Sequence, residues 1–344
     1  DIEDIWQSCH MSSYWRNGPV LNNALSGVDQ ALWDIKGKVA GMPVYDLLGG
    51  KSREAAAVYV IPQGRDRAEY EEHTRALLEQ GFHHIKIGWA SMMAAEDKEY
   101  YQRTIITPKA SIDAGSIIEA TSICRNIVQA FEQFRSTHGP NPQVLFDVKS
   151  PMPPIQGLAL AKDVEPFKPY FLEDLFAPED NDYFRLVREQ TSTPMAMGEL
   201  YSNPHEIIPV IKDRLIDFLR LHISTIGGLT PARKLAALCE AFNVRTAWHG
   251  SADVSPVGHA ANLMLDLNVW NFGVQEASCY LNTNETLKEV FPGVPEVRGG
   301  YMWPSGKPGL GVDINEQLAA KYPLTDTRLR QESARRPDGT VTRP

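Results

Sequence analysis

The chain has 344 residues, of which 43% are hydrophobic and 22% charged, a composition typical of a globular protein with room for one barrel and a smaller appendage. Its net charge of −9 and its lack of a long basic stretch argue against a nucleic-acid partner. There is no apolar run near 18 residues and no charged-then-apolar leader, so neither a membrane span nor secretion is predicted.

The four cysteines lie far apart in the sequence and show no paired spacing. They are Cys9, Cys124, Cys239 and Cys279. This distribution argues against a disulfide framework or a zinc site, and it predicts a reducing, cytoplasmic location. Because the chain opens with DIEDIW and no Met, we expect further residues before it.

In chain order, the first predicted element is a helix over residues 20–40, which has apolar residues at helical spacing and ends at Gly and Pro signals. Eight short β-rich runs follow. They cover residues 55–61, 83–88, 143–148, 170–174, 194–199, 215–221, 243–248 and 269–275. Amphipathic stretches separate them, at 66–80, 116–136 and 229–242 among others. This alternation predicts parallel crossover units, and eight strands predict an α/β fold closed into a TIM-type (β/α) barrel.

The chain is expected to divide into three parts. Residues 1–50 are a helical piece, 51–290 form the barrel with its site, and 291–344 form a tail rich in Gly and Pro that packs back on the helical piece. Residues 89–115 are long and irregular for a connection between a strand and a helix. They are therefore a candidate active-site loop.

A polar residue stands at the carboxyl end of six consecutive predicted strands. These residues are Asp147, Glu173, Glu199, Arg220, His249 and Glu276. Their spacing of 21 to 29 residues matches one strand, one helix and two loops, so all six are expected on the same rim of the barrel.

The three acids, Asp147, Glu173 and Glu199, follow three consecutive strands. Carboxylates that face one point cannot all stay ionised without a cation between them, and a set of oxygen ligands favours Mg²⁺. Each acid alone could instead cap a helix or pair with Lys or Arg. The common register of all three favours the metal site.

Four further rim residues have a functional and a structural interpretation. His249, with Asp253 shortly after it, is predicted to act as a general acid or base, although a buried structural histidine is the alternative. Arg220 can bind a substrate carboxylate or stabilise an oxyanion, or it can pair with a rim acid. Glu276 can orient a substrate hydroxyl or pair with a neighbour.

Two lysines and one tryptophan complete the candidates. Lys149 lies two residues after Asp147, so strand alternation points it into the barrel mouth, and Lys86 ends the second strand. Either lysine can serve as a catalytic acid or base, or can form an ordinary ion pair with a ligand carboxylate. Trp303 is assigned to substrate binding, with packing as the alternative.

Several segments resemble the enolase superfamily, and more narrowly its mannonate and galactonate dehydratase-like branch, which includes starvation-sensing-like proteins. They are SGVDQALWDIKGKVAGMPVYDLLGG, FLED, GE, RTAWHGSADVSP, FGVQE and KPGLGVDI. The resemblance implies a barrel with part of an α+β capping domain, whose N-terminal sheet is absent from this sequence, and an assembly of several subunits. It also implies Mg²⁺-assisted removal of a proton α to a carboxylate of an acid sugar, followed by loss of water.

The resemblance assigns roles residue by residue. Asp147, Glu173 and Glu199 match the metal ligands, and Arg220, His249, Asp253 and Glu276 match substrate-facing residues. The first half of the barrel departs from the pattern, with Lys149 and Ile61 where the branch has histidines and Lys86 where it has arginine. Two alternatives therefore stay open: a regulatory or metabolite-binding member with little dehydratase activity, and an epimerase or racemase that uses Lys149 as its base.

Overall fold

The computed structural model describes residues 1–12, 14–87, 115–149, 153–280 and 285–323. The chain forms two compact units. The first unit comprises Asp1–Val60 and Met197–Pro323, and the described part of the second unit lies within Ile61–Ala196. The predicted loop at 89–115 and the last part of the predicted tail fall outside the described residues, except for Gly115.

The second unit alternates strands with helices. Its strands are β2 (His84–Ile87), β3 (Gln143–Asp147), β4 (Phe171–Glu173) and β5 (Met195–Met197), whose last residue belongs to the first unit. Its helices are α4 (Arg67–Glu79), α7 (Gly115–His138), α8 (Pro154–Asp163) and α9 (Tyr183–Gln190), with short 3-10 turns at Glu165–Phe167 and Pro178–Asp180. Successive strands from β2 to β5 pair in parallel, as the alternation predicts.

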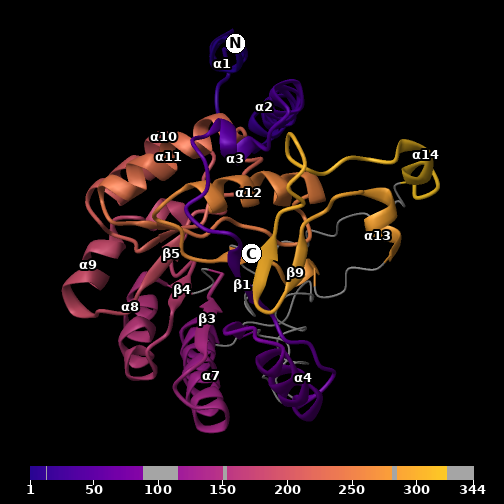
Figure 1. The fold of residues 1–344 in the computed structure, drawn as a ribbon. Coiled ribbons are helices and arrows are strands. Elements are labelled where there is room, and N and C mark those ends of the chain that lie inside the picture. Colours follow the sequence, from indigo (N-terminus) through magenta and orange to yellow (C-terminus); the bar gives the residue numbers. More distant parts are fainter. Residues whose placement is uncertain (13, 88–114, 150–152, 281–284, 324–344) are drawn as a thin grey trace. The chain divides into compact units, whose positions relative to one another are not determined.

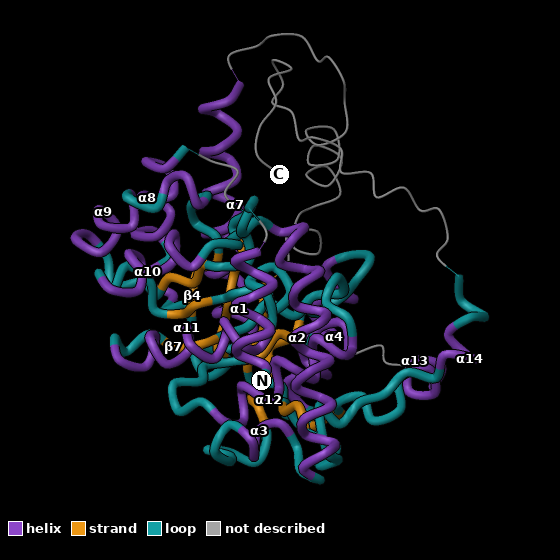
Figure 2. The backbone as a smooth tube through the Cα atoms, turned by 90° about the horizontal axis from the view of Figure 1, so that it is seen from above, coloured by secondary structure: helices purple, strands orange, loops and turns teal. Residues whose placement is uncertain are grey.

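Burial on both faces explains why these strands read as nearly continuous apolar runs. In β3, Val144, Leu145 and Phe146 are all at most 2% exposed. Helix α8 packs against both α7 and α9 (Figure 2). A parallel sheet covered by helices requires apolar residues on both sides, so only the strand ends are left for polar chemistry.

The first unit contains the remaining elements. Its helices are α1 (Ile2–Ser12), α2 (Pro19–Ala40), α3 (Val44–Leu47), α10 (Pro204–Lys212), α11 (Leu229–Ala241), α12 (Pro256–Asn268), α13 (Glu285–Val290) and α14 (Glu316–Ala319). Its strands are β1 (Ala56–Val60), β6 (Phe218–Leu219), β7 (Arg245–Thr246), β8 (Gln275–Glu276), β9 (Glu296–Arg298) and β10 (Tyr301–Trp303). A 3-10 turn covers Ser278–Tyr280. Strand β1 pairs in parallel with β8, and β6 pairs in parallel with β7.

Two features of the first unit come from the C-terminal part of the chain. Strands β9 and β10 form an antiparallel hairpin that pairs with β1 (Figure 1), which the sequence analysis did not predict. Farther on, Gly309 exchanges main-chain hydrogen bonds with Met42 and Val44, and Leu310 N donates to Asp34 Oδ1 at 2.8 Å. The C-terminal segment therefore contacts α2 and the turn that follows it.

The predicted strand at 269–275 differs from the structure, where β8 covers only Gln275–Glu276. The main-chain N–H of Thr246 donates to Asn271 O, and Gly273 N donates to Thr246 O. Pairing there is therefore a single bridge rather than a ladder. At Gly273 a Cβ would lie 2.7 Å from the ring of Phe218. This close approach requires glycine and interrupts the strand before β8.

None of the helices in the described ranges is long and apolar enough to cross a lipid bilayer.

Candidate functional site

In the second unit, two of the predicted acids lie side by side at the ends of neighbouring strands. The parallel register pairs Asp147 of β3 directly with Glu173 of β4. The ammonium of Lys86 on β2 lies 2.9 Å from Asp147 Oδ2 and 3.0 Å from Glu173 Oε2. All three side chains are at most 8% exposed, so their charges interact in a poorly screened environment.

A third acid, Asp174, joins this pair and was not singled out from the sequence. Its backbone has φ 48°, a left-handed conformation that Asp tolerates and that ends β4. Asp147, Glu173 and Asp174 can each offer one oxygen within 4.8 Å of the others, and all three residues are buried. A buried set of carboxylate oxygens fits a hard divalent cation such as Mg²⁺. The adjacent acids in FLED were the available signal for Asp174.

Lys149 contacts Asp147, but not because of the strand alternation that was predicted to direct its side chain. The strand ends at Asp147, and Lys149 has φ 59°, so strand alternation does not determine its direction. Its side chain is 47% exposed and its ammonium lies 2.8 Å from Asp147 Oδ2, while its main-chain N–H donates to Asp147 Oδ1 at 3.1 Å. Both candidate lysines therefore contact the same carboxylate.

In the first unit, a buried ion pair joins Arg220 and Glu276. Arg220 follows β6, Glu276 ends β8, and Arg220 Nη2 donates to Glu276 Oε2 at 2.9 Å. Both side chains are at most 3% exposed, and the guanidinium also lies over the ring of Tyr59, which pairs with Glu276 in register. A Cβ on Gly198 would lie 2.8 Å from the main chain of Arg220, so only glycine allows this approach just before Glu199.

His249 is surrounded by carboxylates. Its Nδ1 lies 3.0 Å from Glu199 Oε2 and 3.6 Å from Glu276 Oε2, and its Nε2 lies 3.1 Å from Asp253 Oδ1. Burial alone would lower the pKa of His249, but the hydrogen bonds to Asp253 and Glu199 and the charge of Glu276 raise it to about 10. With acceptors at both ring nitrogens, the imidazole is held as a cation that can donate a proton.

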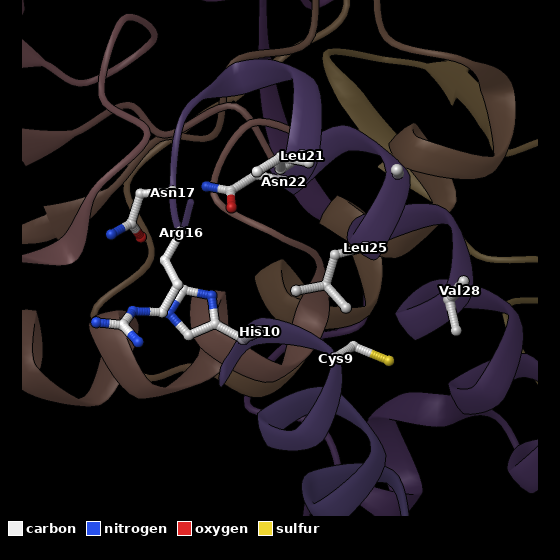
Figure 3. A pocket seen from close by; sticks show the side chains of 9 residues that line it. Cys9, His10, Arg16, Asn17, Leu21, Asn22, Leu25 and Val28 are labelled. Carbon is white, nitrogen blue, oxygen red and sulfur yellow. The ribbon is translucent and has the colours of Figure 1, made fainter. Parts of the chain in front are cut away.

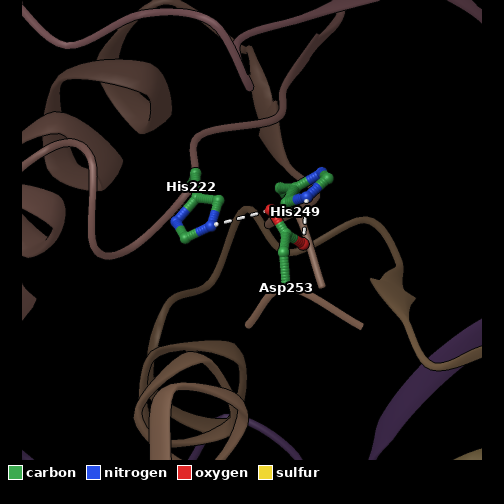
Figure 4. A group of neighbouring side chains, drawn as sticks. All are labelled: His222, His249 and Asp253. Carbon is green, nitrogen blue, oxygen red and sulfur yellow. Dashed lines mark hydrogen bonds and ion pairs between the residues drawn. The ribbon is translucent and has the colours of Figure 1, made fainter. Parts of the chain in front are cut away.

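A second histidine, His222, extends this network and was missed in the sequence. Asp253 contacts both His222 and His249 (Figure 4), whose rings stack with their centroids 5.1 Å apart, and His222 Nε2 lies 3.4 Å from Asp253 Oδ2. The hydrogen bond to His222, followed by that to His249, holds the pKa of Asp253 well below its usual range. The available signal was its position two residues after Arg220, in the segment that follows β6.

Two histidines and an aspartate can also bind a transition metal, and the ligand atoms of His222, His249 and Asp253 lie within 4.8 Å of one another. However, the main-chain N–H of Ser224 donates to His222 Nδ1 at 3.1 Å. The proton of a neutral His222 ring is therefore on Nε2, the atom that faces Asp253. This arrangement favours a hydrogen-bond network over a metal centre.

Trp303 lies in β10, where the guanidinium of Arg298 stacks over its ring at 4.4 Å. Strand β10 pairs with Ala56 and Ala57, the first two residues of β1. Glu276 pairs instead with Tyr59, toward the other end of β1. Substrate contact by Trp303 stays a prediction, and packing against Arg298 is its observed role.

A separate cavity of about 250 Å³ lies between α1 and α2 (Figure 3). It is lined by Cys9, His10, Arg16, Asn17, Leu21, Asn22, Ala24, Leu25 and Val28. Burial, with the charge of Arg16, lowers the pKa of His10. Among the described residues that line it there is no carboxylate, so this cavity lacks the ligands that a Mg²⁺ site requires.

Two family models match the chain. The model described as enolase C-terminal domain-like matches residues 69–318, and the model of the mandelate racemase / muconate lactonizing enzyme N-terminal domain matches residues 1–49. Together they account for most of the sequence.

Known relatives are similar over the whole chain. D-galactonate dehydratase family members from Musicola paradisiaca and Pantoea ananatis are 46% and 47% identical, in matches that cover 100% of this chain and 84% of each relative. A crystal structure of an enolase from Pantoea ananatis with bound D-gluconate and Mg has 46% identity and a TM-score of 0.89, again over 100% of this chain and 84% of the other. The predicted fold class is confirmed: a TIM-type (β/α) barrel with part of a capping domain.

Proposed function

Because the chain belongs to the enolase superfamily and, within it, to the D-galactonate dehydratase family, we propose that it is a Mg²⁺-dependent dehydratase of an acid sugar. The observation that carries the proposal is the buried cluster of carboxylates at the ends of β3 and β4. The Pantoea ananatis relative, which holds D-gluconate and Mg, supports both the ligand class and the metal.

The proposed metal ligands are Asp147, Glu173 and Glu199. Asp147 and Glu173 end β3 and β4, and Glu199 lies two residues after the end of β5. The mutual register of Asp147 and Glu173 supports their joint role, and Asp174 is a neighbouring oxygen donor. Mg²⁺ bound there would stabilise the negative charge that develops on the substrate carboxylate when its α proton leaves.

On the acid side, His249 donates a proton to the β-hydroxyl group as it leaves as water. Carboxylates at both ring nitrogens support this role, because they favour the protonated imidazole. Asp253 and Glu276 offer acceptor oxygens for substrate hydroxyl groups. Arg220 supplies positive charge for an anionic substrate.

On the base side, Lys149 and Lys86 are the candidates to remove the α proton. Both ammonium groups contact Asp147 Oδ2, at 2.8 and 2.9 Å. Lys149 is half-exposed and can reach an incoming substrate, whereas Lys86 is 8% exposed between two carboxylates. We therefore assign the base to Lys149, and comparison of Lys149→Met with Lys86→Met tests the choice.

The test is a screen of acid sugars, including D-gluconate, D-mannonate and D-galactonate, with the protein and Mg²⁺ in D₂O. Formation of a 2-keto-3-deoxy acid that is lost in Glu199→Gln supports the proposal. Deuterium at the α carbon without elimination would instead indicate an epimerase or racemase. Binding of an acid sugar without any turnover would favour the regulatory, metabolite-binding alternative, and either outcome overturns dehydration.

We also propose that the protein is a cytoplasmic homo-oligomer in which residues 1–50 and 291–344 form the cap of a 51–290 barrel. All four cysteines are free thiols, which is compatible with a reducing compartment. The hydrogen bonds of Gly309 to Met42 and Val44 support the association of the tail with the N-terminal helices. Light scattering coupled to size-exclusion chromatography measures the subunit number, and a monomer would contradict the oligomer.

A further inference from the structure

The main chain around His249 has an unusual set of partners. Each of the four carbonyls of residues 248–251 accepts a hydrogen bond from a different side chain later in the sequence. The pairs are Gln275 Nε2 with Trp248 O at 3.3 Å, Asn262 Nδ2 with His249 O at 3.0 Å, Cys279 Sγ with Gly250 O at 3.8 Å, and His259 Nε2 with Ser251 O at 3.3 Å. We call the four donors, Gln275, Asn262, Cys279 and His259, the carbonyl clamp.

Burial explains why these donors are needed. The segment from Ala247 to Gly250 is buried, and a buried carbonyl without a donor is destabilising. Strand β7 has already ended at Thr246, so the ladder no longer supplies donors. The side chains of the clamp supply the hydrogen-bond donors that the strand ladder no longer provides.

Two members of the clamp lie on one face of α12. His259 and Asn262 are three residues apart, which places them on the same side of a helix whose residues from Gly258 to Leu267 are all buried. Asn262 is 0% exposed and His259 is 1% exposed. Such a helix is a rigid support, because neither His259 nor Asn262 can move without repacking of the core.

The fit around Gly250 shows how closely the clamp encloses the segment. A Cβ there would lie 2.6 Å from Gln275 Nε2 and 3.0 Å from His259 Cε1. On the other side, Gly250 N donates to Glu276 Oε2 at 2.9 Å and His249 N donates to Leu221 O at 3.0 Å. The backbone that carries His249 is therefore fixed through both its N–H and its carbonyl groups.

We propose that Asn262 is a positioning residue, which fixes the peptide of His249 through its carbonyl and thereby orients the imidazole toward its carboxylates. The proposal rests on the role of His249 in the proposed function. A displacement of the ring by about 1 Å can cost about 100-fold in rate, so the loss of this one hydrogen bond should appear mainly in kcat.

The chain offers a matched control on the same helix. Asn268 also donates through Nδ2 to two carbonyls, those of Leu48 at 3.3 Å and Gly50 at 2.8 Å, but these belong to a different loop. Asn262→Leu and Asn268→Leu thus remove the same chemical group from one helix. Only Asn262→Leu removes a partner of His249.

The experiment compares both variants with the wild type in two measurements. In turnover of the substrate found by the acid-sugar screen, Asn262→Leu is expected to lower kcat about 10- to 100-fold with KM changed less than about 3-fold, whereas Asn268→Leu keeps kcat within about 2-fold. In ¹⁵N-histidine NMR at fixed pH, the ring nitrogens of His249, assigned with His249→Asn, are expected to shift in Asn262→Leu and not in Asn268→Leu. The NMR measurement needs no substrate, so it tests the clamp even if the proposed dehydration fails.

An unchanged His249 spectrum in folded Asn262→Leu overturns the proposal, as does an equal loss of kcat in both variants. If Asn262→Leu does not fold, Asn262→Ala, which leaves no bulk at the site, is measured in the same way and decides the outcome.

Discussion

The acids of the second unit and the histidine network of the first unit are built in different ways. Asp147 and Glu173 are balanced by the ammonium groups of Lys86 and Lys149, one of them half-exposed and both on long, flexible side chains. In contrast, His249 is held by carboxylates at both nitrogens and by hydrogen bonds to its own main chain.

The comparison shows which kind of chemistry requires a side chain to be held in one fixed orientation. A cation can replace an ammonium group among carboxylates by charge alone, because a half-exposed side chain such as that of Lys149 can withdraw without a change in the backbone. A proton donor has to point at one leaving group, so its orientation is fixed by directional bonds from rigid elements. The predictions below test this contrast, in order of decreasing effect.

The largest effect is expected for the proposed metal ligands. Glu199→Gln should reduce turnover of an acid sugar by about 100-fold or more, because the metal contributes several kcal/mol to the stability of the transition state. Product formation at saturating substrate and Mg²⁺ measures the loss. A variant with more than a tenth of the wild-type rate would remove Glu199 from the site.

The second prediction concerns the stability of the first unit. Arg220→Met leaves the buried carboxylate of Glu276 without its cation and should cost about 3–5 kcal/mol of unfolding free energy. The double variant Arg220→Met/Glu276→Gln should recover a large part of this loss. Urea denaturation measures both, and a cost below about 1 kcal/mol for the single variant would contradict a tight pair.

The third prediction is a pH dependence due to His259. Burial is the largest cause that lowers its pKa, to about 4, while an unfolded histidine titrates near 6.5. Below pH 6.5 the unfolded chain takes up a proton that the folded chain refuses, so stability falls as the pH drops from 6.5 to 4 and then levels off. The contribution is up to about 3 kcal/mol.

Denaturation curves at pH 7.5, 6 and 5 measure this slope, and His259→Gln, which cannot titrate, is the control. The variant should lose less stability than the wild type over the same interval. Equal slopes would show that His259 is protonated in the folded protein.

The smallest effect on stability and on Mg²⁺ affinity is expected for the exposed lysine. Lys149→Met should change stability by only about 0–1 kcal/mol, because its ion pair with Asp147 is partly solvated. The loss of a competing positive charge should strengthen Mg²⁺ binding about 2- to 5-fold. Calorimetric titration of Mg²⁺ measures this change, and weaker binding would mean that Lys149 supports the metal site rather than competes with it.

The strand–helix alternation predicted the fold class, because burial on two faces leaves a clear apolar pattern in each strand. The positions of Asp147 and Glu173 at strand ends also followed from spacing. The β9–β10 hairpin did not, since two three-residue strands around Gly299 and Gly300 are too short to show a period.

The missed site residues share one physical reason. Asp174 lies beside the other acids because its backbone is left-handed. His222 contacts the carboxylate of Asp253, which comes 31 residues later, and Asn262 contacts the main chain of His249. Such contacts depend on register and backbone direction, which residue type alone does not encode. Lys149 illustrates the reverse, because its contact was expected from alternation but arises after the strand has ended.

The central claim is that the proposed ligands Asp147 and Glu199 are each needed for Mg²⁺ binding, and Mg²⁺ binding by calorimetry tests it most directly. Asp147→Asn and Glu199→Gln should each weaken binding by at least about 10- to 100-fold, while Glu240→Gln, at an exposed position of α11, should bind like the wild type. Unchanged affinity in either Asp147→Asn or Glu199→Gln would contradict the role of that residue as a Mg²⁺ ligand.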